Sequence, residues 1–394
     1  MRLEDTDRYA LERVGRYLVA TLHRPHRVLS TCPVNGGLCE HLTHIANHQS
    51  CEGAAHRARY ERIMGLGPSD YHAFACAEAG LAPERTALMG TAANMQCAVV
   101  AHARAEDLGV TLVATAGVLG NATRAGDPAA WHETREGSRA AGHSGPAASA
   151  PTSDAAIGSP STTQSGTIVT LALIDQPCTP ACLVRAATIL TEAKTTALLD
   201  LRLTSLQSPR LATGTGTDQL AIAAPVPRAG DWERQWAGSH DTLGELVARA
   251  THEAVTRALL LQNGIAPALR RNVLAALGRW GCDESLLRAC AEAELDADTR
   301  ALFLANLPAI LHDPASTAAA YALAEIIDLV AVGVLHEGIA RASILDQAAL
   351  LGAAVAVRPE VFVELRAALA VERDLSPARL AALALIRGFA RKWI

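Results

Sequence analysis

Short apolar runs alternate with loops of small polar residues from the start of the chain to about residue 263. Runs rich in β-branched residues predict strands at 27–31, 86–91, 110–115, 167–174 and 219–224. Longer stretches, with apolar residues on one helical face, predict helices at 180–201 and 242–262. This alternation is typical of an α/β or α+β domain.

Both predicted helices carry signals at their ends. Thr179 followed by Pro180 predicts an N-cap with a proline at the first helical position. Thr242 and Glu245 have the spacing of a capping box, and the second helix should stop just before Gly264.

The pattern changes twice along the chain. Residues 135–165 are mostly Ala, Ser, Gly, Pro and Thr with almost no large apolar residue, which predicts a flexible surface insertion. After residue 264 the sequence turns almost wholly helical. We therefore expect an α/β (or α+β) domain at 1–264, with small-residue loops at its strand ends, followed by an all-α unit at 265–394.

Composition narrows the class of protein. Of 394 residues, 50% are hydrophobic and 19% are charged, which is typical of a globular chain. The net charge of -5 and the lack of a Lys/Arg cluster argue against nucleic acid as a partner. No uninterrupted apolar run reaches the roughly 18 residues of a membrane span, and the charged N-terminus has no signal core. We expect a cytoplasmic protein with reduced cysteines, and the sequence leaves a homo-oligomer open.

Four loops of small polar residues follow or precede predicted strands. They are 32–37 (CPVNGG), 91–94 (TAAN), 115–127 (TAGVLGNATRAGD) and 213–218 (TGTGTD). Loops at one end of a sheet commonly line a ligand site, because the sheet positions them and glycines let backbone amides approach. The four loops predict a broad polar site rich in amides.

Two other kinds of site are disfavoured. The phosphate-binding patterns GxGxxG and GxxxxGK[ST] do not occur, which argues against a nucleotide-dependent kinase or transferase. His44 and His48 would share a helix face, but neither HExxH nor paired CxxC motifs accompany them. We therefore expect no metal site.

Lys194 falls within the apolar stripe of the helix at 180–201 and is one of only two lysines in the chain. An unpaired lysine on such a face either destabilises the fold or loses its proton. Lys194 should therefore have a carboxylate partner or a catalytic role. A chain that otherwise uses arginine selects lysine where a compact amine with a tunable pKa is needed. We expect Lys194 to pair with Asp218 of the TGTGTD loop.

Taken together, several segments resemble the adenosylcobinamide amidohydrolase family, which acts in the salvage of cobalamin precursors. The resemblance covers about residues 28–261. Its matching segments are VLSTCPVNGG at 28–37, Asn47-His48, TAGVLGNATRAGD at 115–127, Gly166-Thr167, TEAK at 191–194, ATGTGTD at 212–218 and GSHDTLGE at 238–245.

The resemblance implies hydrolysis of the amide that joins the aminopropanol arm to the corrin ring, with adenosylcobyric acid as product. The substrate would be a cobalt-containing corrinoid, and no further cofactor is expected. The alternative is a corrinoid-binding protein without hydrolytic activity. The expected substrate-binding residues are Asn35, Gly36, Gly37, His48, Thr91, Thr115, Gly117, Asn121, Asp127, Thr213, Gly214, Thr215, Gly216 and Thr217.

Amide hydrolysis needs a nucleophile, a stabiliser of the oxyanion and an acid for the departing amine. Asn121 and the backbone amides of 117–120 are candidates for the oxyanion. Asp218 or Glu192 could activate a water, and Lys194 or His240 could protonate the leaving group. A threonine of the TGTGTD loop acting as covalent nucleophile is an alternative.

Overall fold

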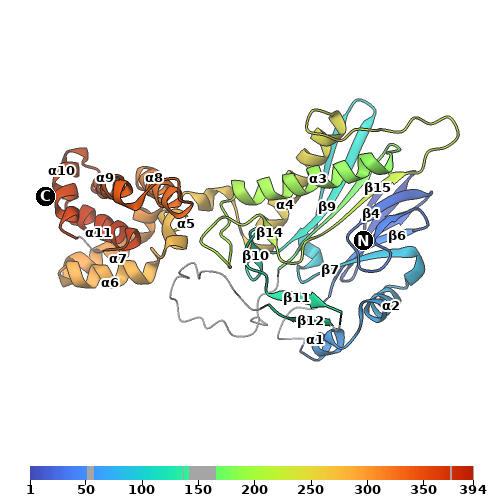
Figure 1. Ribbon diagram of the computed structural model, residues 1–394, viewed down its shortest axis with the longest axis horizontal. Helices are drawn as coiled ribbons and strands as arrows, with labels where there is room; N and C mark the ends of the chain where they lie inside the picture. The colour runs from blue at the N-terminus through green and yellow to red at the C-terminus, as the bar shows by residue number, and fades with distance from the viewer. Residues whose placement is uncertain (51–56, 136, 142–165, 373–374, 394) are drawn as a thin grey trace. The chain divides into compact units, whose positions relative to one another are not determined.

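The computed structural model describes residues 1–50, 57–135, 137–141, 166–372 and 375–393. The described chain divides into two compact units, of which the first ends at Ala266 and the second begins at Pro267. The first contains mixed sheets with a few helices, and the second is a run of helices (Figure 1). The predicted fold class is therefore confirmed.

A six-stranded sheet carries the central strands of the first unit. Only β13 and β15 are parallel in it, and its other neighbours are antiparallel. In spatial order its strands are β5 (Gly37–Cys39), β4 (His26–Ser30), β15 (Gln219–Pro225), β13 (Ile168–Ile174), β9 (Leu108–Ala116) and β8 (Val99–Ala105).

A five-stranded sheet forms from the N-terminal part of the chain. Its last two strands, β6 and β7, are parallel, and the others are antiparallel. In spatial order the strands are β1 (Arg2–Asp5), β2 (Tyr9–Val14), β3 (Tyr17–Leu22), β6 (His44–Gln49) and β7 (Thr86–Thr91).

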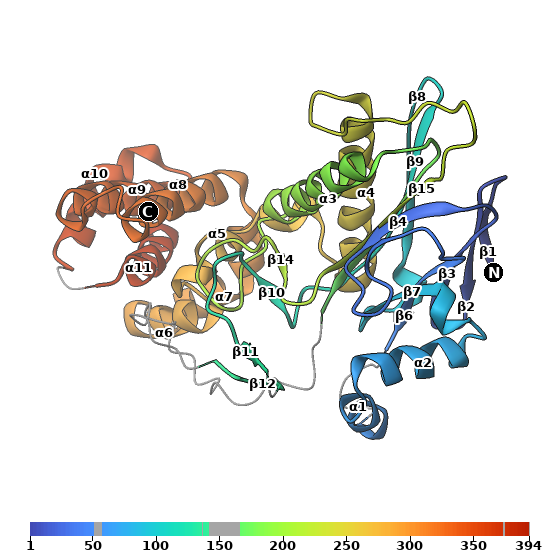
Figure 2. The ribbon, with the colours of Figure 1, turned by 45° about the vertical axis from the view of Figure 1, so that its right-hand side comes forward.

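The two sheets pack face to face between helices. On β9, Leu112 packs toward the helices α3 (Pro180–Asp200) and α4 (Thr242–Asn263), whereas Val113 packs between the two sheets. Side chains alternate between the two faces of a strand, so a strand covered on both faces is apolar throughout. Helix α2 (Pro68–Glu78) covers the outer face of the five-stranded sheet. The layers run helix, sheet, sheet, helix (Figure 2).

The two helices predicted from the sequence are present, with one correction to their caps. Thr179 Oγ1 accepts a hydrogen bond from the Cys182 amide and caps α3. The N-cap of α4 is Asp241, which makes no side-chain cap bond, so the capping box predicted from Thr242 does not form. The helix ends at Gly264 in the left-handed conformation, as expected.

The first unit also contains two small two-stranded antiparallel sheets. Strands β10 (Ala122–Thr123) and β14 (Gly214–Thr215) pair with each other. Strands β11 (Trp131–Thr134) and β12 (Gly137–Ala140) form another pair. Residues 137–140 belong to the segment expected to be a flexible insertion, and the structure places them in strand β12. Residues 142–165 of the insertion lie outside the described residues.

All five predicted strands exist, but the sequence did not predict β1, β2, β3, β5, β6 and β8 of the two main sheets or the four short strands β10, β11, β12 and β14. The spacing of His44 and His48 would place both on one face of a helix, but this segment forms strand β6. In a strand these two residues are separated by about 13 Å, at about 3.3 Å per residue. The remaining short elements of this unit are α1 (Arg57–Met64), η2 (Pro83–Arg85) and η3 (Met95–Cys97).

The second unit has a core of its own, to which Phe303, Leu351 and Leu385 contribute fully buried side chains. Helices α8 (Pro314–Ala331) and α9 (Glu337–Ala356) are long and apolar enough to cross a membrane by length and composition, and α9 is more than half buried in the core. The elements are η4 (Pro267–Arg270), α5 (Val273–Leu277), η5 (Gly278–Trp280), α6 (Glu284–Glu294), α7 (Ala297–His312), α8 (Pro314–Ala331), α9 (Glu337–Ala356), η6 (Pro359–Val361), α10 (Phe362–Ala370) and α11 (Pro377–Ala390).

Candidate functional site

Several of the polar loops gather at one end of the two sheets. Strand β9 ends beside the start of β13, where Thr115 pairs with Val169, and Val169 in turn pairs with Gln219 at the start of β15. Gln219 Oε1 also accepts a hydrogen bond of 2.9 Å from the Gly90 amide of β7, in the other sheet. The segments that follow β7 and β9 and precede β13 and β15 therefore adjoin one another.

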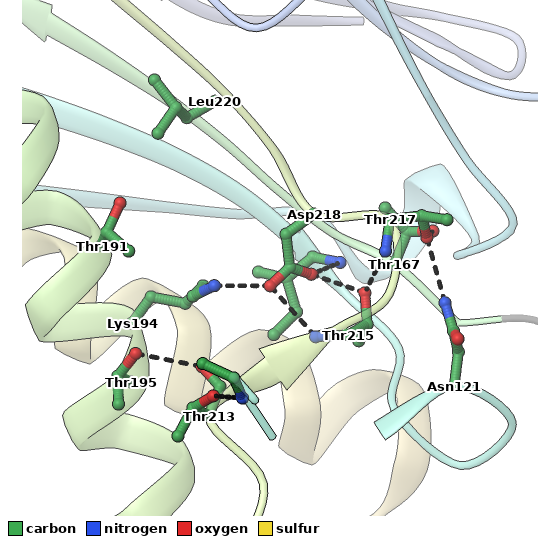
Figure 3. A network of polar contacts seen from close by, with 12 residues as sticks. Asn121, Thr167, Thr191, Lys194, Thr195, Thr213, Thr215, Thr217, Asp218 and Leu220 are labelled. Carbon is green, nitrogen blue, oxygen red and sulfur yellow. Dashed lines mark hydrogen bonds and ion pairs between the residues drawn. The ribbon is translucent and has the colours of Figure 1, made fainter. Parts of the chain in front are cut away.

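An ion pair between Lys194 and Asp218 lies at this end (Figure 3). Lys194 Nζ is 2.5 Å from Asp218 Oδ2, and the two side chains keep 13% and 17% of their surface exposed. Lys194 belongs to α3, whereas Asp218 immediately precedes β15. The pairing expected from the sequence is present, and it joins the helical layer to the sheet.

The carboxylate of Asp218 accepts four hydrogen bonds, two on each oxygen. Oδ2 accepts from the Lys194 ammonium and, at 3.1 Å, from the Thr215 amide. Oδ1 accepts from the Ile168 amide at 3.0 Å and from the Thr215 hydroxyl at 2.6 Å. A carboxylate offers about four lone-pair positions. In this arrangement no position is left on Asp218 for a water molecule.

Gly214 gives the ion pair its room. A Cβ at this position would lie 2.4 Å from Asp218 Oδ2 and 2.8 Å from Lys194 Nζ. Both distances are far shorter than non-bonded atoms tolerate. The first glycine of the TGTGTD loop is therefore required by the packing of the pair.

A network of hydrogen-bonded hydroxyl and amide groups extends from Thr215. The Thr217 amide donates to Thr215 Oγ1 at 3.4 Å, and Thr217 Oγ1 lies 2.6 Å from Thr167 Oγ1. Asn121 Nδ2 donates to Thr217 Oγ1 at 3.1 Å and to the carbonyl of Gly166 at 2.8 Å. Both amide hydrogens of Asn121 are thus engaged, so a role at the oxyanion would require one of these bonds to open.

Asp127 and Thr213 hold the loops 115–127 and 213–218 in place. Asp127 Oδ2 accepts from Ser205 Oγ at 2.6 Å and from the Arg124 amide at 2.8 Å. Burial by itself raises the pKa of Asp127, but these hydrogen bonds outweigh it and lower the pKa below its usual value. Thr213 Oγ1 accepts from the Ala125 amide at 2.8 Å. Both side chains fix the conformation of the loops.

The last turn of α4 holds the loop 91–94 and the first part of the loop 115–127. Gln262 Oε1 accepts from the Asn94 amide at 3.0 Å, and Asn263 Oδ1 accepts from the Val118 amide at 3.0 Å. The amide of Gly117 also has a partner, a backbone carbonyl at 3.2 Å. Of the four amides considered for the oxyanion, those of Leu119 and Gly120 are left without a partner among the described residues.

Thr115 and Thr91 face inward at the strand ends, and both are buried. Thr115 Oγ1 accepts from Asn47 Nδ2 at 2.9 Å, and Thr91 Oγ1 accepts from the Ala93 amide at 3.0 Å. Asn47 Oδ1 is buried and has no hydrogen-bond partner among the described residues. Sequence reasoning did not single out Asn47 or Gln219 as site residues. The only signal for Asn47 was its place in one matching segment.

His48 lies on the far side of the five-stranded sheet, against α2. Its Nδ1 donates to the Met89 carbonyl at 2.8 Å, its Nε2 accepts from the Tyr71 hydroxyl at 2.5 Å, and its ring stacks on Tyr17. Burial lowers the pKa of His48 to about 4. The structure makes His48 a neutral core side chain and does not bring it to Lys194.

The Asn-Gly-Gly segment at 35–37 also has a structural explanation. Asn35 has positive φ, and its Nδ2 donates to the carbonyls of Pro83 and Thr86, both at 2.8 Å. A Cβ on Gly36 would lie 1.9 Å from the Cys32 carbonyl oxygen. Gly37 begins the edge strand β5. The described contacts give these residues a role in the turn.

His240 and Glu192 lie away from the ion pair. His240 is exposed just before the first turn of α4, and the opposite end of this 22-residue helix contacts the loops. A helix of that length spans about 33 Å. Glu192 is exposed two residues before Lys194, which places it about 200° around α3. Neither side chain has a hydrogen bond to Asp218.

The described residues hold no group of three His, Cys, Asp or Glu side chains placed to bind a metal ion. Cys32, which begins the CPVNGG segment, is buried, and burial raises the pKa of its thiol. A protonated, buried thiol is a poor nucleophile. The described residues bring amine, carboxylate, hydroxyl and amide groups together at the site.

A similar protein occurs in Methanocaldococcus jannaschii. It is an uncharacterized protein, 29% identical over 197 residues, which cover 50% of this chain and 71% of that protein. The model of the adenosylcobinamide amidohydrolase family matches residues 2–267. That range contains the whole site and stops where the second compact unit begins. The resemblance seen in the sequence is thus confirmed, and the chain belongs to the adenosylcobinamide amidohydrolase family.

Proposed function

We propose that the protein hydrolyses the amide bond between the aminopropanol arm and the corrin ring of adenosylcobinamide, giving adenosylcobyric acid. The observation that carries this proposal is the ion pair of Lys194 and Asp218, with the Thr215 hydroxyl on the same carboxylate. All three residues lie within the range that matches the family. Family membership supports the reaction class, and the site supplies groups that can perform it.

Lys194 is suited to protonate the departing nitrogen. Its ammonium is held at Asp218, and its side chain keeps 13% of its surface exposed. An amine leaves an amide readily only after protonation, which makes a positioned acid necessary. The exposed His240 at the far end of α4 is poorly placed for this step.

The substrate also accounts for the many threonine and amide groups around the pair. A corrin ring carries several peripheral carboxamides, which donate and accept hydrogen bonds as Thr, Asn and backbone groups do. Hydrolysis of an amide consumes only water and transfers no electrons. We therefore propose that the reaction needs no cofactor, and that cobalt enters with the substrate.

Incubation of the protein with adenosylcobinamide, followed by mass detection of adenosylcobyric acid, tests this function. Conversion should be lost in Lys194→Met, which keeps a side chain of similar length but removes the amine. Loss of conversion in this variant shows that the activity does not come from a contaminating enzyme. Tight binding of the corrinoid without conversion by the unmodified protein would favour a corrinoid-binding protein instead.

A further inference from the structure

The hydrogen bonds around Asp218 restrict which atom it can activate. Its four donors are the amides of Ile168 and Thr215, the Lys194 ammonium and the Thr215 hydroxyl. Backbone amides are poor nucleophiles and the Lys194 ammonium is the proposed acid, so the Thr215 hydroxyl is the donor that Asp218 can activate as a nucleophile. A water molecule could reach Asp218 only by displacing one of the four donors.

We infer that Thr215 is the nucleophile and forms a covalent ester with the corrin carboxyl group. This inference rests on the proposed amide hydrolysis. An activated hydroxyl nucleophile is recognised by a base within about 2.6–3.2 Å, with the base itself oriented by a third group. Thr215 Oγ1 lies 2.6 Å from Asp218 Oδ1, and Lys194 holds the other oxygen of that carboxylate.

The geometry separates Thr215 from the other threonines of its loop. Thr213 Oγ1 accepts a hydrogen bond from the Ala125 amide, and Thr217 Oγ1 contacts Thr167 and Asn121. Neither of these hydroxyls contacts Asp218. Thr215 also belongs to β14, whose pairing with β10 fixes its backbone. Thr215 is therefore the threonine of this loop with a base in reach.

The reaction balances with these three side chains and one water molecule. Thr215 Oγ attacks the amide carbonyl carbon and passes its proton to Asp218, while the C–N bond breaks and Lys194 gives a proton to the nitrogen. Asp218 then returns its proton to Lys194. Water hydrolyses the ester, so that its hydroxyl joins the acyl carbon and its remaining proton restores the threonine. The products are one carboxylic acid and one amine.

Replacing the hydroxyl tests the inference. Thr215→Val keeps the shape but removes the nucleophile, so kcat should fall at least about a thousandfold, while Thr215→Ser should keep a tenth or more. Corrinoid binding, followed by visible absorbance, should be unchanged in both. Thr195→Val is the matched control, because Thr195 also gives one hydrogen bond, to the Thr213 carbonyl, and does not contact Asp218. It should stay within about threefold of the unmodified protein.

A second variant separates a nucleophile from a hydroxyl that only positions Asp218. Thr215→Cys should form a thioester with the substrate, detected after acid quenching as an added corrin acyl mass on the peptide that contains position 215. No adduct, or a Thr215→Val variant that loses less than about a hundredfold in kcat, would overturn the inference. Failure of the proposed function would differ, because the unmodified protein would then convert nothing.

Discussion

Gly214 and Asp218 are in such close contact that a larger residue at position 214 must displace the carboxylate or the Lys194 ammonium. The Cβ of an alanine would lie 2.4 Å from Asp218 Oδ2, the oxygen that binds Lys194. The backbone of the TGTGTD loop therefore packs directly against the ion pair.

We predict that Gly214→Ala lowers kcat by at least about tenfold and destabilises the first unit by about 1–3 kcal/mol, the usual range for overpacking. The methyl group must push the carboxylate or the amine away. Activity and the midpoint of chemical denaturation measure the two effects. Gly278→Ala is the control, since a Cβ there meets no atom within 4 Å and its backbone is helical. Unchanged activity in Gly214→Ala would contradict the role given to this contact.

Lys194→Met should reduce kcat by roughly a hundredfold or more if the amine transfers a proton. Lys194→Arg restores the charge, but a guanidinium holds its proton near neutral pH, so a general acid at this position is not rescued. A purely structural ion pair would be partly restored by arginine, and recovery in that variant would contradict the acid role. The matched control is Lys392→Met, which removes the other lysine of the chain.

The buried His48 predicts a pH dependence of stability. Its pKa of about 4 in the folded state lies below its usual value of 6.5, so the unfolded state binds more protons between these values. The stabilisation is complete above pH 6.5 and is lost as the pH falls toward 4, by up to about 3 kcal/mol. Denaturation series from pH 7 to 4.5 measure this slope.

His48→Gln should remove the part of that slope that comes from His48, while His26 and His44, whose pKa values burial also lowers, keep a smaller slope in the same direction. The window above pH 4.5 is chosen because Glu78, whose pKa is lowered to about 2 chiefly by its hydrogen bonds from Arg59, titrates in the folded protein only at lower pH. The same slope in His48→Gln as in the unmodified protein would show that another group causes it.

A chain that ends at Ala266 should fold and keep its activity. The boundary between the two compact units falls after this residue, and the last turn of α4, which holds two site loops, is retained. Circular dichroism and the conversion assay check this prediction. If residues 1–266 are insoluble where the full chain is soluble, then the helical unit is needed for the first unit to fold.

The sequence predicted the Lys194–Asp218 pair because each step of that reasoning concerned local geometry. The rotation of about 100° per residue fixes which side chains share a helix face, so Lys194 had to lie on the buried side of α3. Of the five strands found from the sequence, β9, β13 and β15 carry long apolar runs. Strand β2 (YALERV) and strand β6 (HIANHQ) contain charged or histidine residues and lack such a run, so they were missed.

Sequence reasoning could not separate residues that serve the fold from residues that serve the site. His48 and Asn35 lie in segments that match the family. Their side chains, however, bond to the Met89 and Pro83 carbonyls and not to residues around Lys194. The partners of His48 and Asn35 come from other elements, and no local pattern shows them. The four hydrogen bonds of Asp218 could not be predicted for the same reason. Ile168 and Lys194 reach Asp218 only after the sheet and α3 have packed together.

The last turn of α4 has a consequence for the order in which the protein is made. Gln262 and Asn263 hold the loops that follow β7 and β9, and they are the last residues that contribute to the site. Domains generally fold as units during synthesis, beginning with the N-terminal one. Every residue of the first unit is therefore synthesised before residues 267–394, so the site can assemble while the helical unit is still being made.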